Sequence, residues 1–160
     1  MKGKEITASF KKKFGKKILE SNIDKNGKIN YDVIWLKIPR ELVPEAVKHL
    51  FEFGFPHFAV ISANDFDDHI ELIYEFSVGW GEREGEVLVN FKTDLPAKDK
   101  KIESICHLIP GALVSEREKQ EMFGISIHGI PDDRNFFLPE DFKGLPGIKK
   151  DKDVDALEVD

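Results

Sequence analysis

The sequence predicts an α+β domain of about four mostly antiparallel strands with helices packed on one face, followed by an extended C-terminal arm. Three observations lead to this prediction. Apolar residues recur at every third or fourth position in some segments, they alternate with polar residues in others, and after residue 124 Gly and Pro interrupt both patterns. A chain of 160 residues is long enough to bury one core. We therefore expect an α+β domain over residues 1–124, an extended arm over 125–150 and a disordered acidic tail over 151–160.

The N-terminal segment has the spacing of a helix. An apolar residue at every fourth position predicts roughly four turns with one buried stripe. The stripe consists of Ile6, Phe10, Phe14 and Ile18. A second helix is predicted over residues 42–51, because its apolar residues share one face and Gly54 follows, as is common just past a helix end.

Two further helices are expected near the end of the domain. The first is predicted over residues 102–109 because its apolar residues have helical spacing. These residues are Ile102, Ile105, Cys106 and Ile109. Pro110 and Gly111 then break the helix, and a shorter one is expected to carry the charged residues that begin at Glu116.

Four segments have the pattern of strands. They are residues 29–35, 58–62, 70–76 and 87–91. The third alternates strictly between apolar and polar residues, which predicts a strand with one wet face. The fourth returns from a hairpin loop over residues 79–85. Trp80 in that loop either anchors an interface or packs on its own sheet.

Composition excludes several classes of function. The net charge of −6 argues against nucleic acid as a partner. A single cysteine, Cys106, excludes an internal disulfide and an iron–sulfur or zinc site of the usual multi-cysteine type.

No stretch approaches the roughly 20 apolar residues that span a bilayer, and the lysine-rich N-terminus lacks the apolar core of a signal peptide. We therefore expect a cytoplasmic protein that reaches the membrane only through partners. The lysines of residues 11–17 form either a solvated helix face or a contact with anionic lipid or an acidic neighbour.

A dense charged cluster precedes the arm. Carboxylates three residues apart share a helix face, so Glu116, Glu118 and Glu121 raise the hypothesis of a metal site or a general acid. Metal catalysis needs more ligands, and Arg117 within the cluster offsets its charge. We therefore predict a structural ion-pair network, with no catalytic, metal-binding or cofactor-binding residue. The alternative is a small free-standing enzyme that uses Glu118 or Glu121 with His128.

The arm combines restricted backbone with apolar and charged side chains. Gly129, Pro131 and Pro139 limit the conformations of its backbone, which lowers the entropy lost on docking. Its apolar anchors are Phe136, Phe137, Leu138 and Phe142, and its charged groups include Asp132, Arg134, Glu140 and Asp141. We interpret the arm as a docking element for another chain. The alternative is an arm that folds back on its own domain.

The cluster and the arm together form a recognisable pattern. It comprises Glu116-Arg117-Glu118, Glu121, Met122-Phe123-Gly124-Ile125, Gly129, Pro131-Asp132, Arg134, Leu138-Pro139-Glu140-Asp141 and Lys149-Lys150-Asp151. This pattern resembles the signature of the 30 kDa subunit of respiratory complex I, a family that includes a small subunit of membrane-bound nickel–iron hydrogenases. The chain departs from that signature at Glu121, Ile130, Asn135 and Phe142, where Asp, His, Arg and Trp are usual.

The resemblance implies a function in an assembly. It implies a cofactor-free accessory subunit that clamps a large catalytic subunit and iron–sulfur subunits of a membrane-associated oxidoreductase, with the signature residues in structural and inter-subunit roles. The iron–sulfur clusters, and in a hydrogenase the nickel–iron centre, would belong to the partner subunits. The lead-in Ile109-Pro110-Gly111-Ala112 is more similar to the hydrogenase branch than to the quinone-reducing branch. A subunit of an NADH or quinone dehydrogenase stays open as an alternative.

Overall fold

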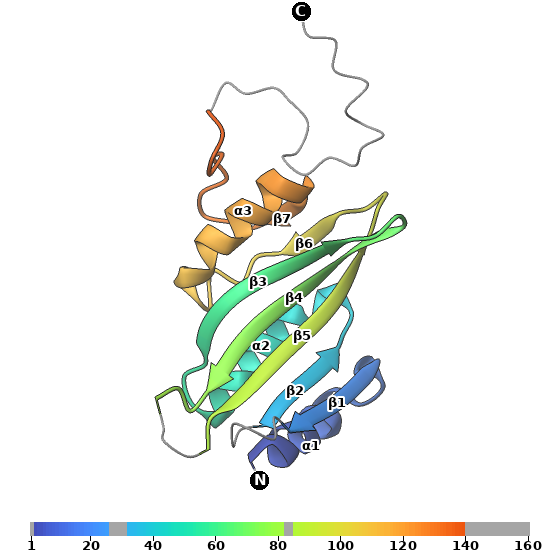
Figure 1. The fold of residues 1–160 in the computed structure, drawn as a ribbon, viewed down its shortest axis with the longest axis vertical. Helices are drawn as coiled ribbons and strands as arrows, with labels where there is room; N and C mark the ends of the chain where they lie inside the picture. Colours follow the sequence, from blue (N-terminus) through green and yellow to red (C-terminus); the bar gives the residue numbers. More distant parts are fainter. Residues whose placement is uncertain (1, 26–31, 82–84, 140–160) are drawn as a thin grey trace, which may run out of the picture.

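A five-stranded sheet is the largest element of the protein, whose structure is a computed structural model that describes residues 2–25, 32–81 and 85–139. Its strands lie in the order β1-β2-β5-β4-β3 (Figure 1). They are β1 (Glu20–Lys25), β2 (Asp32–Lys37), β3 (His57–Asp65), β4 (His69–Val78) and β5 (Val87–Pro96). Neighbouring strands pair antiparallel except β2 and β5, which are parallel. The α+β class with a mostly antiparallel sheet is confirmed.

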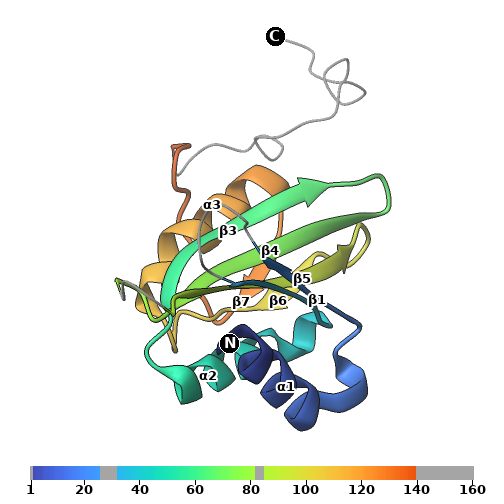
Figure 2. The same cartoon turned by 60° about the horizontal axis from the view of Figure 1, so that its bottom comes forward.

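Two helices cover one face of this sheet, as Figure 2 shows. They are α1 (Lys2–Phe14) and α2 (Val43–Leu50). A third helix, α3 (Leu113–Phe123), runs beside edge strand β3. Two short parallel strands, β6 (Lys101–Glu103) and β7 (Ser126–His128), flank α3 in the sequence and form a sheet of their own. Short 3-10 turns occur at Gly15–Lys17, Arg40–Leu42, Phe51–Phe53 and Pro110–Ala112.

The core lies between the sheet and the helices. In β4 the buried residues Leu72, Tyr74 and Phe76 alternate with half-exposed ones, as the period of two requires. The buried stripe of α1 faces them, and its Phe10 ring lies 5.5 Å from the ring of Phe91. Phe91 is also 5.8 Å from Phe76. Phe91 therefore joins the helical layer to the sheet.

Most predicted elements match. The four predicted strands correspond to β2, β3, β4 and β5, although residues 29–31 lie outside the described residues. The first helix ends one turn earlier than predicted, because Gly15 takes a left-handed conformation with φ 52°. Strand β1 was not predicted, since its residues are mainly polar and alternate weakly.

The predicted helix over residues 102–109 is wrong. The segment begins as strand β6, where Ile102 pairs with Ile127, and continues as a tight turn. Two of its backbone amides donate to acceptors outside the segment: the amide of Ser104 to the carbonyl of His128 at 2.8 Å, and the amide of Ile105 to the carboxylate of Glu116 at 2.8 Å. The apolar residues are buried as expected, but by tertiary contacts that the helical spacing did not reveal. No helix in the described ranges is both long and apolar enough to cross a bilayer.

Replacing Phe91 with Ala should lower the free energy of unfolding by about 3–5 kcal/mol, because it leaves a cavity between the helical layer and the sheet. Urea denaturation followed by circular dichroism measures this change. Phe55, which is 73% exposed, provides the control, and Phe55→Ala should stay within about 0.5 kcal/mol of the wild type. Equal effects of the two substitutions would contradict the described core.

Candidate docking site on helix α3

Helix α3 positions the charged cluster between two sharp turns. Its start follows a 3-10 turn with Pro110 at the first position, which suits the fixed φ of proline. Its end is set by Gly124, whose φ of 64° and ψ of 35° are left-handed. This conformation disfavours any residue with a side chain and turns the chain toward β7. The signature glycine is therefore a helix stop that places the arm next to α3.

Glu116 points from α3 into the protein and is fully buried. Its carboxylate accepts hydrogen bonds from the Ser104 hydroxyl at 2.7 Å, the Ile105 amide at 2.8 Å and the Cys106 thiol at 3.1 Å. These bonds satisfy a buried charge and fix the turn that follows β6. Burial raises the pKa of the Cys106 thiol to about 11, and the hydrogen bond to Glu116 adds to the shift. Burial likewise raises the pKa of Tyr74, and the charge of Glu116 contributes.

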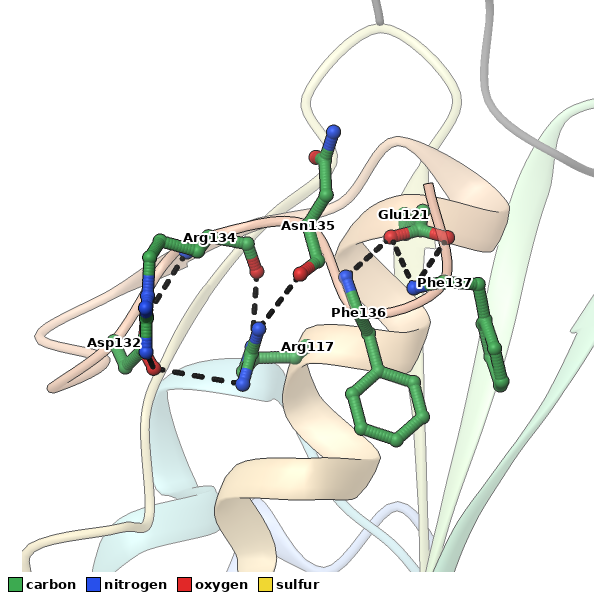
Figure 3. A network of polar contacts seen from close by, with 7 residues as sticks. All are labelled: Arg117, Glu121, Asp132, Arg134, Asn135, Phe136 and Phe137. Atoms are coloured by element: carbon green, nitrogen blue, oxygen red, sulfur yellow. Dashed lines mark hydrogen bonds and ion pairs between the residues drawn. The ribbon is translucent and has the colours of Figure 1, made fainter. Parts of the chain in front are cut away.

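Arg117 lies on another side of α3 and binds the arm (Figure 3). Its guanidinium donates hydrogen bonds to the carbonyl oxygens of Arg134 at 2.9 Å and Asn135 at 2.7 Å. It also lies 3.4 Å from a carboxylate oxygen of Asp132 and 5.5 Å from the centre of the Phe136 ring. The planar guanidinium of Arg117 thus contacts two backbone carbonyls, a carboxylate and an aromatic ring at the same time.

Glu121 binds the next residues of the arm from one turn further along α3. Its carboxylate accepts hydrogen bonds from three successive amides, those of Phe136 at 2.5 Å, Phe137 at 3.0 Å and Leu138 at 3.1 Å. Three consecutive N–H groups that converge on one anion form a nest. We call the contacts of Arg117 and Glu121 with residues 132–138 the arm clasp; Figure 3 shows all of it except the contact with Leu138.

The arm clasp leaves aromatic surface exposed. The Phe136 and Phe137 rings are 4.5 Å apart at an interplanar angle of 79°, a T-shaped pair. Phe137 is 61% exposed and Phe136 is 37% exposed. The described part of the arm therefore folds back on its own domain through backbone and charged groups, while its phenylalanine side chains are not sealed inside the fold.

The remaining predicted site residues lie in α3, in the irregular backbone after β7, or outside the described residues. In α3, Glu118 pairs with Lys119 at 2.9 Å, and Phe123 is half-buried against the core. Gly129 has a positive φ of 78°, so it allows the turn after β7. The exposed Pro131 and Pro139 lie in irregular backbone, and the Pro139 carbonyl accepts a hydrogen bond from the Asn135 side chain at 2.8 Å. Glu140, Asp141 and Phe142 lie outside the described residues.

Three contributors to this region were missed in the sequence. Ser104 and the backbone of Ile105 bind Glu116, and the Gln120 side chain accepts a hydrogen bond from the Ile127 amide at 3.1 Å. Gln120 sits between the signature residues Glu118 and Glu121 on the helix, which was the only signal for it. These contacts join β6, α3 and β7 into one unit.

The groups named for a free-standing enzyme have other partners. Both oxygens of Glu121 accept hydrogen bonds from the arm, and Glu118 pairs with Lys119. His128 is exposed at the end of β7, where it lines a depression with Arg40 and Ser126. Within residues 2–25, 32–81 and 85–139, no three His, Cys, Asp or Glu side chains group so that they could hold a metal ion.

Comparison with known proteins shows the family of this chain. The model of the family described as "Respiratory-chain NADH dehydrogenase, 30 Kd subunit" matches residues 36–156, more than half of the chain. The match confirms the resemblance inferred from the signature residues.

Relatives come from two kinds of complex. NADH-quinone oxidoreductase subunit 5 of Thermus thermophilus is 30% identical over 138 residues, which cover 81% of this chain and 64% of that protein. The chain thus spans less than two thirds of the length of this relative. Membrane-bound hydrogenase subunit beta of Pyrococcus furiosus is 27% identical over 130 residues, which cover 80% of this chain and 75% of that protein.

Solved structures share the fold. A chain of the archaeal membrane-bound sulfane sulfur reductase matches with a TM-score of 0.64 and 20% identity, over 81% of this chain and 72% of that one. A trypsin-resistant fragment of Nqo5 matches with a TM-score of 0.61 and 23% identity, over 82% of this chain and 99% of that one. At these identities the structures support the fold alone.

Replacing Glu121 with Ala should release the amides of residues 136–138, because no other carboxylate accepts from them within the described residues. We expect their hydrogen exchange to become roughly tenfold faster at neutral pH. Amide exchange measured by mass spectrometry or NMR reports this directly. Glu118→Ala removes the same charge three residues earlier on α3 and should leave these amides unchanged. Equal exchange in the two variants would contradict the arm clasp.

The carboxyl of Asp132 should titrate below its ordinary pKa of about 3.9. The chief cause is Arg134, whose guanidinium donates to it at 2.9 Å and 2.8 Å, and Arg117 adds a second positive charge. Because folding lowers this pKa, the contribution to stability is present above about pH 4 and is lost as the pH falls toward the folded value. NMR of the Asp132 carboxyl carbon measures the midpoint. In Arg134→Gln the midpoint should rise toward the ordinary value, and an unchanged midpoint would refute this cause.

Proposed function

Because the chain belongs to the family of the 30 kDa subunit of the respiratory-chain NADH dehydrogenase, we propose that it is a cofactor-free accessory subunit of a complex-I-related, membrane-associated oxidoreductase. In this role it clamps the large catalytic subunit, and through it the iron–sulfur subunits. Redox chemistry and membrane attachment belong to those partners. The protein then lies at the cytoplasmic side of the membrane without entering it.

The arm clasp is the observation that carries this proposal. The two exposed phenylalanine rings of the arm leave apolar area in water, which contact with a partner would remove. The clasp uses backbone amides, backbone carbonyls and charged groups, with the Phe136 ring as its one aromatic contact, so it fixes the arm while the Phe137 ring stays exposed. A pre-organised arm also loses less conformational entropy when it meets a partner. Aromatic residues are the usual anchors of protein interfaces.

Two kinds of complex are candidates. The relatives include a subunit of an NADH-quinone oxidoreductase and a subunit of a membrane-bound hydrogenase. The lead-in Ile109-Pro110-Gly111-Ala112 favours the hydrogenase type. Purification of the native complex through a tag on this chain distinguishes them, because a hydrogenase contains nickel in its large subunit whereas a quinone-reducing enzyme does not.

Replacing Phe137 and Leu138 together with Asp should release the chain from its complex while its domain stays folded. Carboxylates at the anchor positions are costly to bury in an apolar interface, whereas Phe137 is already solvent-exposed in the chain itself. Co-purification from the native host measures retention, and thermal unfolding of the isolated variant checks the fold. Phe55→Asp changes a phenylalanine away from the arm that is 73% exposed, against 61% for Phe137, and should leave assembly intact. Full retention of the double variant would overturn the docking role of the arm.

A further inference from the structure

The face of the five-stranded sheet that points away from α1 and α2 is called here the outer face. The period of two in each strand assigns its residues. In β4, Glu71, Ile73 and Glu75 are half-exposed, while the residues between them are buried in the core. Strand pairing aligns Glu75 with Asn90 of β5, and Asn90 in turn with Trp35 of β2. The outer face therefore runs continuously across the sheet from β4 to β2.

Carboxylates outnumber cations on the outer face. Edge strand β1 contributes Glu20 and Asp24, which register opposite outer-face positions of β2. With Glu71, Glu75 and Asp94 they make five carboxylates, against two lysines, Lys37 and Lys92. The acidic residues come from three different strands, so the negative charge is a property of the whole face rather than of one segment.

Both lysines are neutralised within the face. Lys37 pairs with Asp94 at 2.7 Å, and Lys92 lies 3.9 Å from Glu71. The pKa of Lys37 is raised, chiefly because Asp94 accepts its hydrogen bond, although partial burial opposes the rise. Among the described residues, no Lys or Arg forms an ion pair with the three other carboxylates, those of Glu20, Asp24 and Glu75. Within the described residues, Glu75 accepts a hydrogen bond from the Ser62 hydroxyl and Asp24 accepts one from the Asn22 amide, but these uncharged donors do not offset the negative charge of the two carboxylates.

The outer face also presents apolar surface in a depression. Trp35 lines an open depression of about 350 Å³ over β1, β2 and β5, together with Glu20 and Asp24. The ammonium of Lys92 lies 4.9 Å from the centre of the Trp35 ring and covers one part of it. Ile73 lies beside this region, because it pairs with Lys92 across β4 and β5. Lys37 and Lys92 also line the depression, but carboxylates outnumber lysines over the face as a whole. An aromatic floor in an acidic face fits a segment that carries both cationic and apolar side chains.

The opposite side of the molecule has the reverse charge. The exposed lysines of α1 and the turn after it include Lys11, Lys12, Lys16 and Lys17, on the layer that covers the other face of the sheet. The net charge of −6 is therefore unevenly distributed. Anionic lipid is repelled by the outer face, and so is nucleic acid. The charge complement of this face is a basic polypeptide.

We propose that the outer face binds a basic, extended polypeptide segment of another subunit of the complex. Cationic side chains of that segment lie against Glu75 and Asp24, and an apolar side chain lies against Trp35. This contact is separate from the one made by the arm. It rests on the proposed function, because the segment comes from an assembled complex.

Charge reversal on the outer face tests this proposal. In the variant Asp24→Lys with Glu75→Lys, retention of the chain in the complex purified from its native host at physiological salt should fall about tenfold or more, because like charges then face each other. Neither carboxylate is ion-paired with a cation of the described chain, so the variant should melt within a few degrees of the wild type. The control Glu45→Lys with Glu103→Lys adds the same charge at exposed sites of α2 and β6, away from the outer face, and should be retained.

A photo-cross-linker provides a readout that does not depend on the stability of the variant. The residue p-benzoylphenylalanine at position 73 should cross-link, in the purified complex, to a peptide of positive net charge from another subunit. The same residue at position 12 on α1 should not cross-link to that peptide. No cross-link from position 73, or one to a neutral or acidic peptide, would overturn the proposal.

Failure of the proposed function gives a different result. If the tagged wild-type chain purifies without any other subunit, the proposed function falls, and this proposal falls with it. If the wild type assembles and the charge-reversed variant is retained equally well, only the outer-face proposal falls. The control variant separates a loss of a specific contact from a general effect of added positive charge.

Discussion

The arm depends on two side chains of α3 that stand one turn apart. Residues four apart lie on one helix face, so Arg117 and Glu121 present a cation and an anion side by side. An irregular segment has amides and carbonyls without regular partners. The Arg117 guanidinium donates hydrogen bonds to the carbonyls of Arg134 and Asn135. The Glu121 carboxylate accepts hydrogen bonds from the amides of residues 136–138. Over this short stretch, the charged side chains of α3 thus supply the hydrogen-bond partners that a regular helix or sheet would give the backbone of the arm.

The same helix secures its own position with a second carboxylate. Glu116 points inward and holds the turn after β6, whereas Glu121 points outward and holds the arm. The two therefore differ in environment although both belong to one charged cluster. A fully buried carboxylate is tolerated only with good hydrogen-bond donors, and Glu116 has three. Because both segments are fastened to α3, the orientation of the arm relative to the sheet is coupled to the turn through which α3 is anchored.

The sequence was sufficient for the elements that bury a regular pattern and insufficient for those held by specific partners. The alternation in β4 and the stripe of α1 reflect the core directly, and both were predicted. The apolar residues from Ile102 to Ile109 have helical spacing, but the Ile105 amide donates to Glu116 and cannot serve a helix. The cluster was interpreted as an ion-pair network; Arg117 and Glu118 do form ion pairs, whereas Glu116 accepts hydrogen bonds from uncharged groups. Glu116 points inward and Glu121 points outward because of the way α3 is rotated about its axis and because the arm returns past Glu121. The spacing of the residues in the sequence does not specify either feature.

The distribution of charge gives the proposed role in an assembly a physical rationale. In that proposed role, a small subunit that clamps larger ones must resist rotation, and a single contact leaves an axis about which it can turn. The arm presents apolar rings beside α3, whereas the outer face presents uncompensated carboxylates on the sheet. Apolar contact is short-ranged and nondirectional, while charge complementarity selects the orientation of approach. Two surfaces of different chemistry on a rigid domain thus fix position and orientation separately, which is what a clamp without chemistry of its own requires.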